Sequence, residues 1–154
     1  MTILAIDPAS HLIGIAFSNA GIYTYYTLKI SNNTLPERLS IIRAKLYDLI
    51  IELEPEHIVT EQAIIPKRQK HGAVVAYVVG ILFEICGTLD IPVYEMPIKL
   101  AKKHISGNAG ASKTDVQDSL RALGYDNFET DDASDALSIL LAFESRQGFM
   151  LPRT

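Results

Sequence analysis

The chain has 154 residues, a formal net charge of −4 and a single cysteine, Cys86. This length suits one domain with a single core, so we expect residues 1–154 to form one domain. With 48% hydrophobic and 21% charged residues the composition excludes a disordered chain, and one cysteine excludes a disulfide within it. Neither a signal peptide nor a membrane-spanning run is visible, so we expect a cytoplasmic protein with no membrane partner. The acidic total argues mildly against binding to nucleic acid.

The first thirty residues predict three β-strands. Residues 2–6 are apolar throughout most of their length, as in a strand that is buried on both faces, and Asp7 follows them. Residues 11–19 and 23–30 then read as two strands of a hairpin that turns at Ala20 and Gly21.

Helices and strands alternate after this hairpin. Thr34 and Glu37 form a capping box that opens a helix, which Pro55 ends. A short strand follows at residues 57–60. The apolar stretch 72–86 contains valines that would suit a strand, but its length favours a helix.

The last third of the chain predicts one more strand and two more helices. Residues 91–95 form the strand. Ser112 and Asp115 make a second capping box, at the start of a helix to about residue 123. Thr130 or Asp131 caps a last helix through residue 144. The order of elements predicts an α/β fold in which helices flank a five-stranded mixed sheet.

Four acidic residues stand at the ends of predicted elements. Asp7 and Glu61 end two strands, and Asp132 and Asp135 share one face at the start of the last helix. A carboxylate at the end of a buried strand is costly unless it is paired, and a hard cation such as Mg²⁺ is its natural partner. Two such ions can activate water and stabilise the leaving oxygen of a phosphodiester. Taken singly, each acid also suits a helix terminus, a turn or the surface.

Two segments carry basic side chains and no acidic ones. In residues 62–83 the charged side chains are Lys67, Arg68 and Lys70, and in residues 96–114 they are Lys99, Lys102, Lys103 and Lys113. We interpret both segments as basic loops that bind DNA phosphates. The alternative is a pair of solvated loops whose charges only keep the protein in solution.

The chain resembles the RuvC-like Holliday junction resolvases, a branch of the RNase H-like superfamily. The resemblance lies in ILAIDPAS at residues 3–10, VTEQ at 59–62, KKHISGNAGASK at 102–113 and DASDAL at 132–137. It implies an RNase H-like fold. It also implies four metal-binding catalytic acids and two basic residues near the scissile phosphate: Asp7, Glu61, Asp132, Asp135, Lys102 and Lys113.

The resemblance further implies an activity and its partners. Family members cut four-way DNA junctions with paired symmetric nicks that leave 5′-phosphate and 3′-hydroxyl ends, using two Mg²⁺ or Mn²⁺ ions. Such a substrate demands a twofold homodimer, for which the apolar helix 72–86 is our candidate interface. The sequence does not show whether a branch-migration motor assists.

Two departures from the family pattern are visible. Ala9 replaces the usual glycine after the first aspartate, and Ile64 and Ile65 stand where the family often has an aromatic wedge. A phage-encoded or otherwise divergent member fits these departures, with the nucleoid or a phage-infected host cell as its setting.

Three alternatives stay open. A nuclease of the same fold that acts on flaps, forks or RNA hybrids would carry the same acids. A junction-binding protein without cleavage activity would keep the fold, although intact acids argue against it. Actin-like kinases and ATPases also begin with a strand and an aspartate, but they need two large domains, for which 154 residues are too few.

Overall fold

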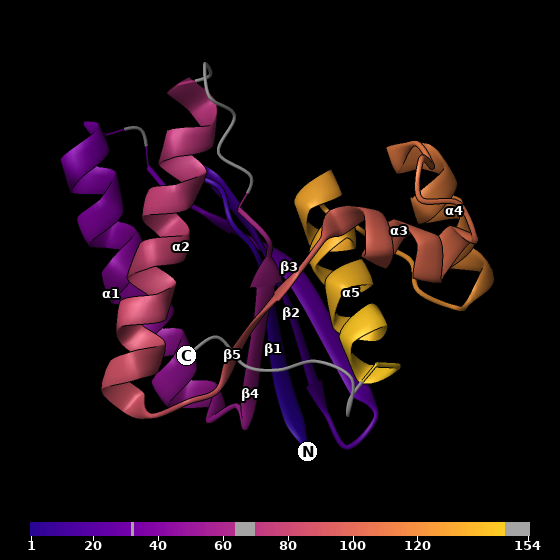
Figure 1. The fold of residues 1–154 in the computed structure, drawn as a ribbon, viewed down its shortest axis with the longest axis horizontal. Coiled ribbons are helices and arrows are strands. Elements are labelled where there is room, and N and C mark those ends of the chain that lie inside the picture. The colour runs from indigo at the N-terminus through magenta and orange to yellow at the C-terminus, as the bar shows by residue number, and fades with distance from the viewer. Residues whose placement is uncertain (32, 64–69, 147–154) are drawn as a thin grey trace.

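The computed structural model describes residues 1–31, 33–63 and 70–146, and of residues 70–72 it describes the backbone alone. Its centre is a five-stranded sheet in the order β3-β2-β1-β4-β5 (Figure 1). The strands are β1 (Thr2–Asp7), β2 (Leu12–Asn19), β3 (Ile22–Lys29), β4 (His57–Glu61) and β5 (Val93–Met96). β1, β2 and β3 pair antiparallel, whereas β4 pairs parallel with both β1 and β5. The predicted mixed sheet of five strands is confirmed.

Helices cover both faces of this sheet (Figure 1). α1 (Leu35–Leu53) and α2 (Lys70–Leu89) lie on one face. α3 (Ile98–Ser106), α4 (Lys113–Ala122) and α5 (Asp131–Glu144) lie on the other, with α5 directly against the strands.

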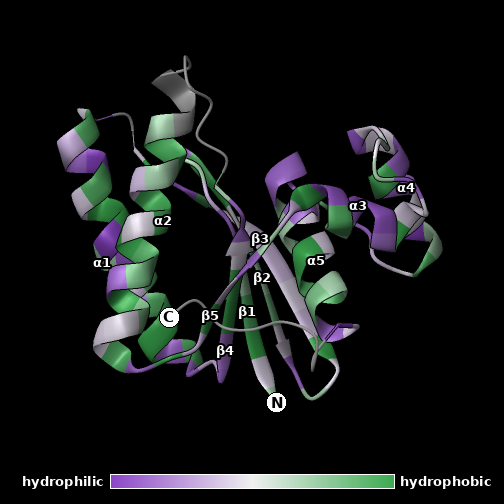
Figure 2. Ribbon diagram, viewed as in Figure 1, coloured by the Kyte–Doolittle hydropathy of each residue, from purple (hydrophilic) through white to green (hydrophobic). Residues whose placement is uncertain are grey.

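Alternation along β1 explains how one strand serves two cores. Ile3 and Ala5 belong to the hydrophobic cluster beneath α5, whereas Leu4 and Ile6 belong to the cluster beneath α1 and α2. All four side chains are fully buried, and burying each large one contributes about 1.5–3 kcal/mol. β1 is accordingly coloured as hydrophobic along most of its length (Figure 2). The same alternation turns Asp7 towards α5.

Both predicted capping boxes are present. The Glu37 carboxylate accepts hydrogen bonds from the backbone N–H and the hydroxyl of Thr34, at 2.9 and 2.7 Å. The Asp115 carboxylate does the same for Ser112, at 2.9 and 2.7 Å. The stretch that includes residues 72–86 is helical, as its length predicted.

The second basic segment corrects one prediction. It contains the helix α3 and is not a loop throughout. Ala101 is buried in the cluster beneath α5, and Ile98 and Ile105 pack against the same cluster. This apolar spacing is typical of a helix, and so is Gly107 at its C-terminal end, with a φ of 76°. The prediction of a loop rested on the lysines of this segment and not on its apolar spacing.

Across residues 1–31, 33–63 and 70–146, none of the helices combines the length and the apolar character that a membrane crossing requires.

Candidate active site

The site begins where two neighbouring parallel strands end. Ile6 pairs with Thr60 in the register of β1 and β4, so Asp7 and Glu61 follow side by side at the carboxyl ends of both strands. Asp7 is only 8% exposed. Burial, followed by a hydrogen bond with Glu61 and by the charges of Glu61, Asp135 and Asp132, raises the pKa of the Asp7 carboxyl from 3.8 to about 9. Without a cation the Asp7 carboxyl therefore keeps its proton at neutral pH.

The first turns of α5 bring two more acids to this place. Asp132 and Asp135 both raise the pKa of Asp7 through their charges, so both lie within electrostatic range of it. The side chain of Asp135 is 15% exposed. Burial raises its pKa to about 6, although the charges of Lys113 and Lys102 act in the opposite direction.

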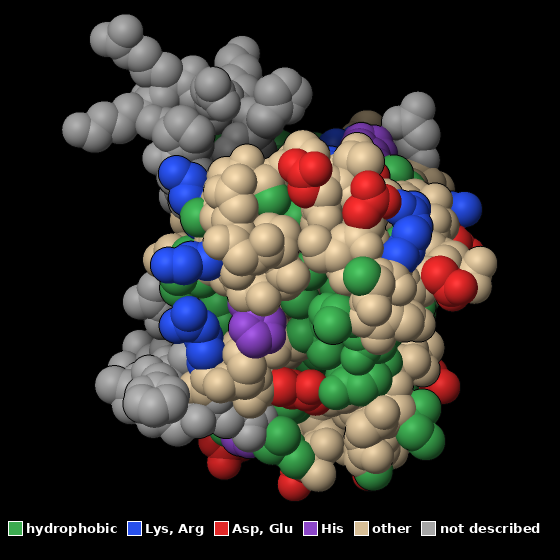
Figure 3. All heavy atoms as spheres, turned by 90° about the vertical axis from the view of Figure 1, so that its right-hand side faces the viewer, with side chains coloured by type: hydrophobic (Ala, Val, Ile, Leu, Met, Phe, Trp, Pro, Cys, Tyr) green, Lys and Arg blue, Asp and Glu red, His purple; other side chains and the backbone are tan. Residues whose placement is uncertain are grey.

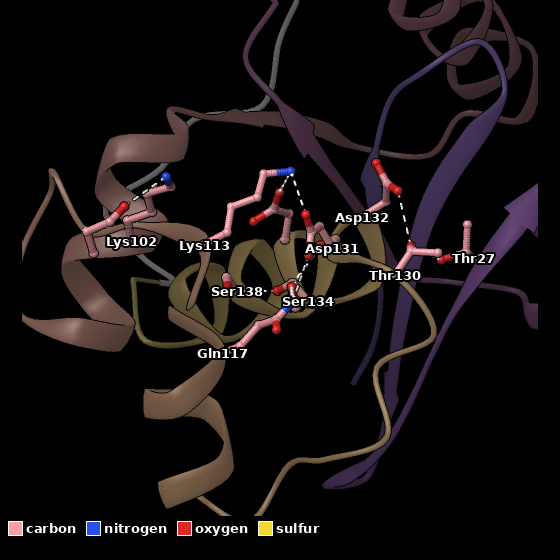
Figure 4. Close-up of polar contacts among 11 residues, drawn as sticks. Thr27, Lys102, Lys113, Gln117, Thr130, Asp131, Asp132, Ser134 and Ser138 are labelled. Atoms are coloured by element: carbon pink, nitrogen blue, oxygen red, sulfur yellow. Dashed lines mark hydrogen bonds and ion pairs between the residues drawn. The ribbon is translucent and has the colours of Figure 1, made fainter. Parts of the chain in front are cut away.

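Lys113 lies beside acids of α5, and Lys102 lies further from them (Figure 4). The Lys113 ammonium is 3.3 Å from Oδ2 of Asp131 and 3.8 Å from Oδ2 of Asp135. Lys102 donates a hydrogen bond to the Ala111 carbonyl at 3.0 Å, and its charge acts on Asp135. Of the two lysines that the resemblance implied, Lys113 therefore contacts a predicted acid, Asp135, and Lys102 acts on it only through its charge.

The other predicted DNA-binding residues lie apart from the acids or outside the described structure. Lys99 and Lys103 are exposed on α3. Lys67 and Arg68 lie outside the described residues, and Lys70 begins α2 without a described side chain. The face seen in Figure 3 carries basic side chains at both of its sides, with acidic side chains between them.

Sequence reasoning missed three polar residues next to the site. Asp131 pairs with Lys113 and also accepts a hydrogen bond from Gln117 Nε2 at 3.0 Å. Thr130 donates a hydrogen bond to Asp132 Oδ2 at 3.1 Å. The sequence showed Thr130 and Asp131 only as cap candidates for the last helix, and Gln117 carried no signal at all.

The chemistry of these acids fits a hard divalent cation. A carboxyl that is both buried and held against a second carboxyl is costly unless a proton or a cation lies between them. Carboxylate oxygens from three separate elements are the ligands that Mg²⁺ prefers. Within the described parts of the chain, no three Asp, Glu, His or Cys side chains are gathered closely enough to hold an ion. Asp132 is instead turned to Thr130, and Asp135 lies nearest Lys113.

A family model described as crossover junction endodeoxyribonuclease RuvC matches residues 3–143. Among curated proteins of that name, the one from Vibrio atlanticus is 29% identical over 145 residues, which cover 90% of this chain and 84% of the relative. The one from Bdellovibrio bacteriovorus is 26% identical over 166 residues, which cover 99% of this chain and 96% of the relative.

Two solved structures show the same fold. A structure of T. thermophilus RuvC in complex with a Holliday junction substrate superposes with a TM-score of 0.83, at 22% identity, over 99% of both chains. The yeast mitochondrial Holliday junction resolvase superposes with a TM-score of 0.67, at 13% identity, over 95% of this chain and 78% of that one.

Proposed function

This chain belongs to the RuvC family of crossover junction endodeoxyribonucleases, and we propose that residues 1–154 act as one nuclease domain whose four acids cut four-way DNA junctions. It is thus a Holliday junction resolvase with an RNase H-like α/β fold. The observation that supports the assignment of the site is the buried Asp7, which lies beside Glu61 at the ends of β1 and β4 and feels the charges of Asp132 and Asp135.

Asp7, Glu61, Asp132 and Asp135 would hold the metal. Members of the family typically use Mg²⁺, and we propose two Mg²⁺ or Mn²⁺ ions for each site. When bound, the ions would lower the pKa of the attacking water and stabilise the departing 3′ oxygen, which leaves 5′-phosphate and 3′-hydroxyl ends. Asp7 and Glu61 extend from the ends of two neighbouring strands, and Asp132 and Asp135 extend from one helix. The proposed metal ligands therefore come from three elements of the fold.

The lysines act on the phosphate. Lys113 lies beside Asp135 and the charge of Lys102 also reaches it, and an ammonium there would offset the charge that develops on the phosphate during hydrolysis. Lys99 and Lys103 are exposed on α3 and would contact the DNA backbone farther from the cut. Lys67, Arg68 and Lys70 remain predicted DNA contacts from the first basic segment. A DNA substrate would place the enzyme in the cytoplasm, with the nucleoid or with phage DNA.

A homodimer would supply the two symmetric cuts. An open groove of about 530 Å³ lies between α1 and α2, and Tyr77, Ala76 and Gly80 of α2 line it with Leu39 of α1. Tyr77 is 50% exposed there, and among the described residues nothing outside the adjacent helix backbone lies within 4 Å of a Cβ built at Gly80. We propose this surface of α2 as the twofold interface, as the apolar sequence 72–86 predicted.

Cleavage of a synthetic mobile four-way junction with Mg²⁺ tests the proposal. We expect paired symmetric nicks that disappear in EDTA and with Asp7→Asn, while Asp7→Asn still binds the junction. Cleavage of flap and RNA-hybrid substrates is measured under the same conditions. Cutting of these alone would overturn the junction assignment and keep the metal site. Junction binding without any cutting by the unaltered enzyme would instead indicate a binding protein.

A further inference from the structure

A row of three residues crosses the sheet next to the acids. Asp7 of β1 pairs with Gly14 of β2, and Gly14 pairs with Thr27 of β3. Residues directly opposite one another in antiparallel strands extend to the same face, so this row faces α5. Thr27 is 6% exposed, which makes it a buried hydroxyl that needs a hydrogen-bond partner.

The middle of this row has no side chain, and the start of α5 occupies the space. A Cβ added at Gly14 would lie 2.0 Å from the Asp132 carbonyl oxygen and 3.0 Å from the Asp7 Cβ. The backbone of Asp132 therefore rests on the bare backbone of β2, directly beside Asp7. This contact sets how near α5 comes to the sheet.

Two hydrogen bonds continue from the end of the row to the Asp132 carboxylate (Figure 4). The hydroxyl oxygens of Thr27 and Thr130 lie 2.6 Å apart, and the Thr130 hydroxyl lies 3.1 Å from Asp132 Oδ2. An ionised carboxylate only accepts, so Thr130 gives its one proton to Asp132. Thr27 must then donate to Thr130. The direction is Thr27 to Thr130 to Asp132, and we call this series the threonine relay.

The Thr130 hydroxyl bonds the Asp132 carboxylate and does not cap the helix. Thr130 is the N-cap of α5, where a threonine hydroxyl ordinarily accepts a hydrogen bond from the backbone of the first turn. Its side chain makes no such capping bond here. The hydroxyl is instead committed to Asp132 on one side and to Thr27 on the other.

We propose that Thr27, acting through Thr130, is a positioning residue that fixes the orientation of the Asp132 carboxylate next to Asp7 and Glu61. This rests on the proposed function, in which Asp132 holds the cation. The relay occupies Oδ2 with a directed hydrogen bond and leaves Oδ1 free for a ligand. Partners that orient a ligating carboxylate in this way change metal affinity when they are lost.

Mn²⁺ affinity, measured by calorimetry on the protein without DNA, tests the relay. Thr130→Val should weaken Mn²⁺ binding about tenfold, within the range for losing such a partner. Thr27→Val should weaken it by a smaller factor, and Thr130→Ser should restore wild-type affinity. Because the relay is serial, adding Thr27→Val to Thr130→Val should cause no further loss. Thermal unfolding in EDTA verifies that each variant folds.

Two reference variants separate the possible failures. Ser138→Ala removes another buried hydroxyl of α5, which bonds the Ser134 carbonyl at 2.8 Å, and should leave Mn²⁺ affinity unchanged. Asp132→Asn should weaken binding at least as much as Thr130→Val. If Asp132→Asn weakens binding and Thr130→Val does not, or if the two valine losses add, the relay is overturned. If Asp132→Asn binds Mn²⁺ normally, Asp132 is not a ligand and the proposed site is wrong as well.

Discussion

The ammonium nitrogen of Lys113 lies 3.3 Å from Oδ2 of Asp131. Asp131 directly precedes Asp132, whose backbone packs against Gly14 of β2. Both side chains are about half exposed, so the pair contributes at most about 1 kcal/mol. Its importance is functional. A lysine held by a neighbouring carboxylate is not free to bind a phosphate, and DNA has to compete with Asp131 for it.

Asp131→Asn should therefore tighten junction binding. The change removes one of the two carboxylates that hold Lys113, so we expect up to a fivefold gain, which is about the value of an exposed ion pair. The gain should shrink as salt increases, because a phosphate contact is screened and releases counterions. Fluorescence anisotropy with a labelled junction in EDTA measures both effects.

Asp118→Asn is the matched control for this comparison. Asp118 pairs with Arg121 on the exposed side of α4 at 2.6 Å, so its removal changes the net charge equally without freeing Lys113. We expect a smaller change in affinity. Equal gains in both variants would contradict the role of Asp131 and leave net charge as the cause.

Lys113 and Lys103 should differ in which step they affect. Lys113→Gln removes an ammonium next to Asp135 and should lower the cleavage rate by roughly a hundredfold or more, since such donors act on the transition state. Lys103→Gln removes an exposed charge of α3 and should only weaken binding, reducing the salt slope by about 1. Single-turnover cleavage and salt-dependent binding distinguish the two. Equal losses of rate would refute the distinction.

The acids could be predicted because each ends an element that hydrophobic patterning reveals. Asp7 directly follows an apolar run, and Glu61 follows another, so their meeting at one edge of a parallel pair follows from strand order alone. Asp132 and Asp135 needed only the start of a helix. Local patterns of this kind also predicted the sheet and the two capping boxes.

What the sequence could not show is register across the sheet. Nothing near Thr27 in the chain signals that it lies in line with Gly14 and Asp7, because strand pairing decides this and not local composition. The partnership of Asp131 with Lys113 has the same origin, since it joins the starts of two helices. The helix α3 was missed for another reason, namely that its three lysines stand between the apolar positions of its buried face.

Gly14→Ala should damage the fold and the site together. The added Cβ would meet the Asp132 carbonyl at 2.0 Å, so α5 must move away from β2, at a cost of about 1–3 kcal/mol. The cleavage rate should fall more than the affinity for the junction. Asp132 and Asp135 would move away from Asp7, whereas the exposed lysines would keep their positions. Thermal unfolding and single-turnover cleavage measure the two losses.

Gly87→Ala is the control for Gly14→Ala and should not destabilise the protein. Gly87 lies within α2, and a Cβ there would meet nothing within 4 Å, so alanine should stabilise the helix by up to about 1 kcal/mol without affecting cleavage. A stable, fully active Gly14→Ala would show that α5 does not depend on close contact with β2.

Asp7→Asn should make the metal-free protein less sensitive to rising pH. The pKa of Asp7 is raised from 3.8 to about 9, so the folded chain keeps a proton that the unfolded chain loses between these values. The retained proton stabilises the folded protein fully below pH 3.8, and this contribution is lost as the pH rises towards 9. The free energy of unfolding then falls by about 1.4 kcal/mol per pH unit for one fully coupled proton. Asparagine does not ionise and escapes this loss.

Unfolding in EDTA at about pH 5 and about pH 8 tests this linkage. The unfolding temperature of Asp7→Asn should exceed that of the unaltered protein by a margin that grows with pH. Asp48→Asn, at an exposed position of α1, should show no growing margin. A constant difference for Asp7→Asn would mean that the Asp7 carboxyl ionises normally in the fold.

Tyr77→Glu should separate the proposed dimer into folded monomers. Tyr77 is 50% exposed in the groove between α1 and α2, so glutamate leaves the fold intact but places a charge in an apolar interface, where it would lose its hydration. Ile22→Glu, at a 73% exposed position of the β2–β3 hairpin, is the control and should remain dimeric. Sedimentation velocity should show the change in mass, and junction cleavage should pass from paired to single nicks. A dimeric Tyr77→Glu with paired nicks would place the interface on another surface.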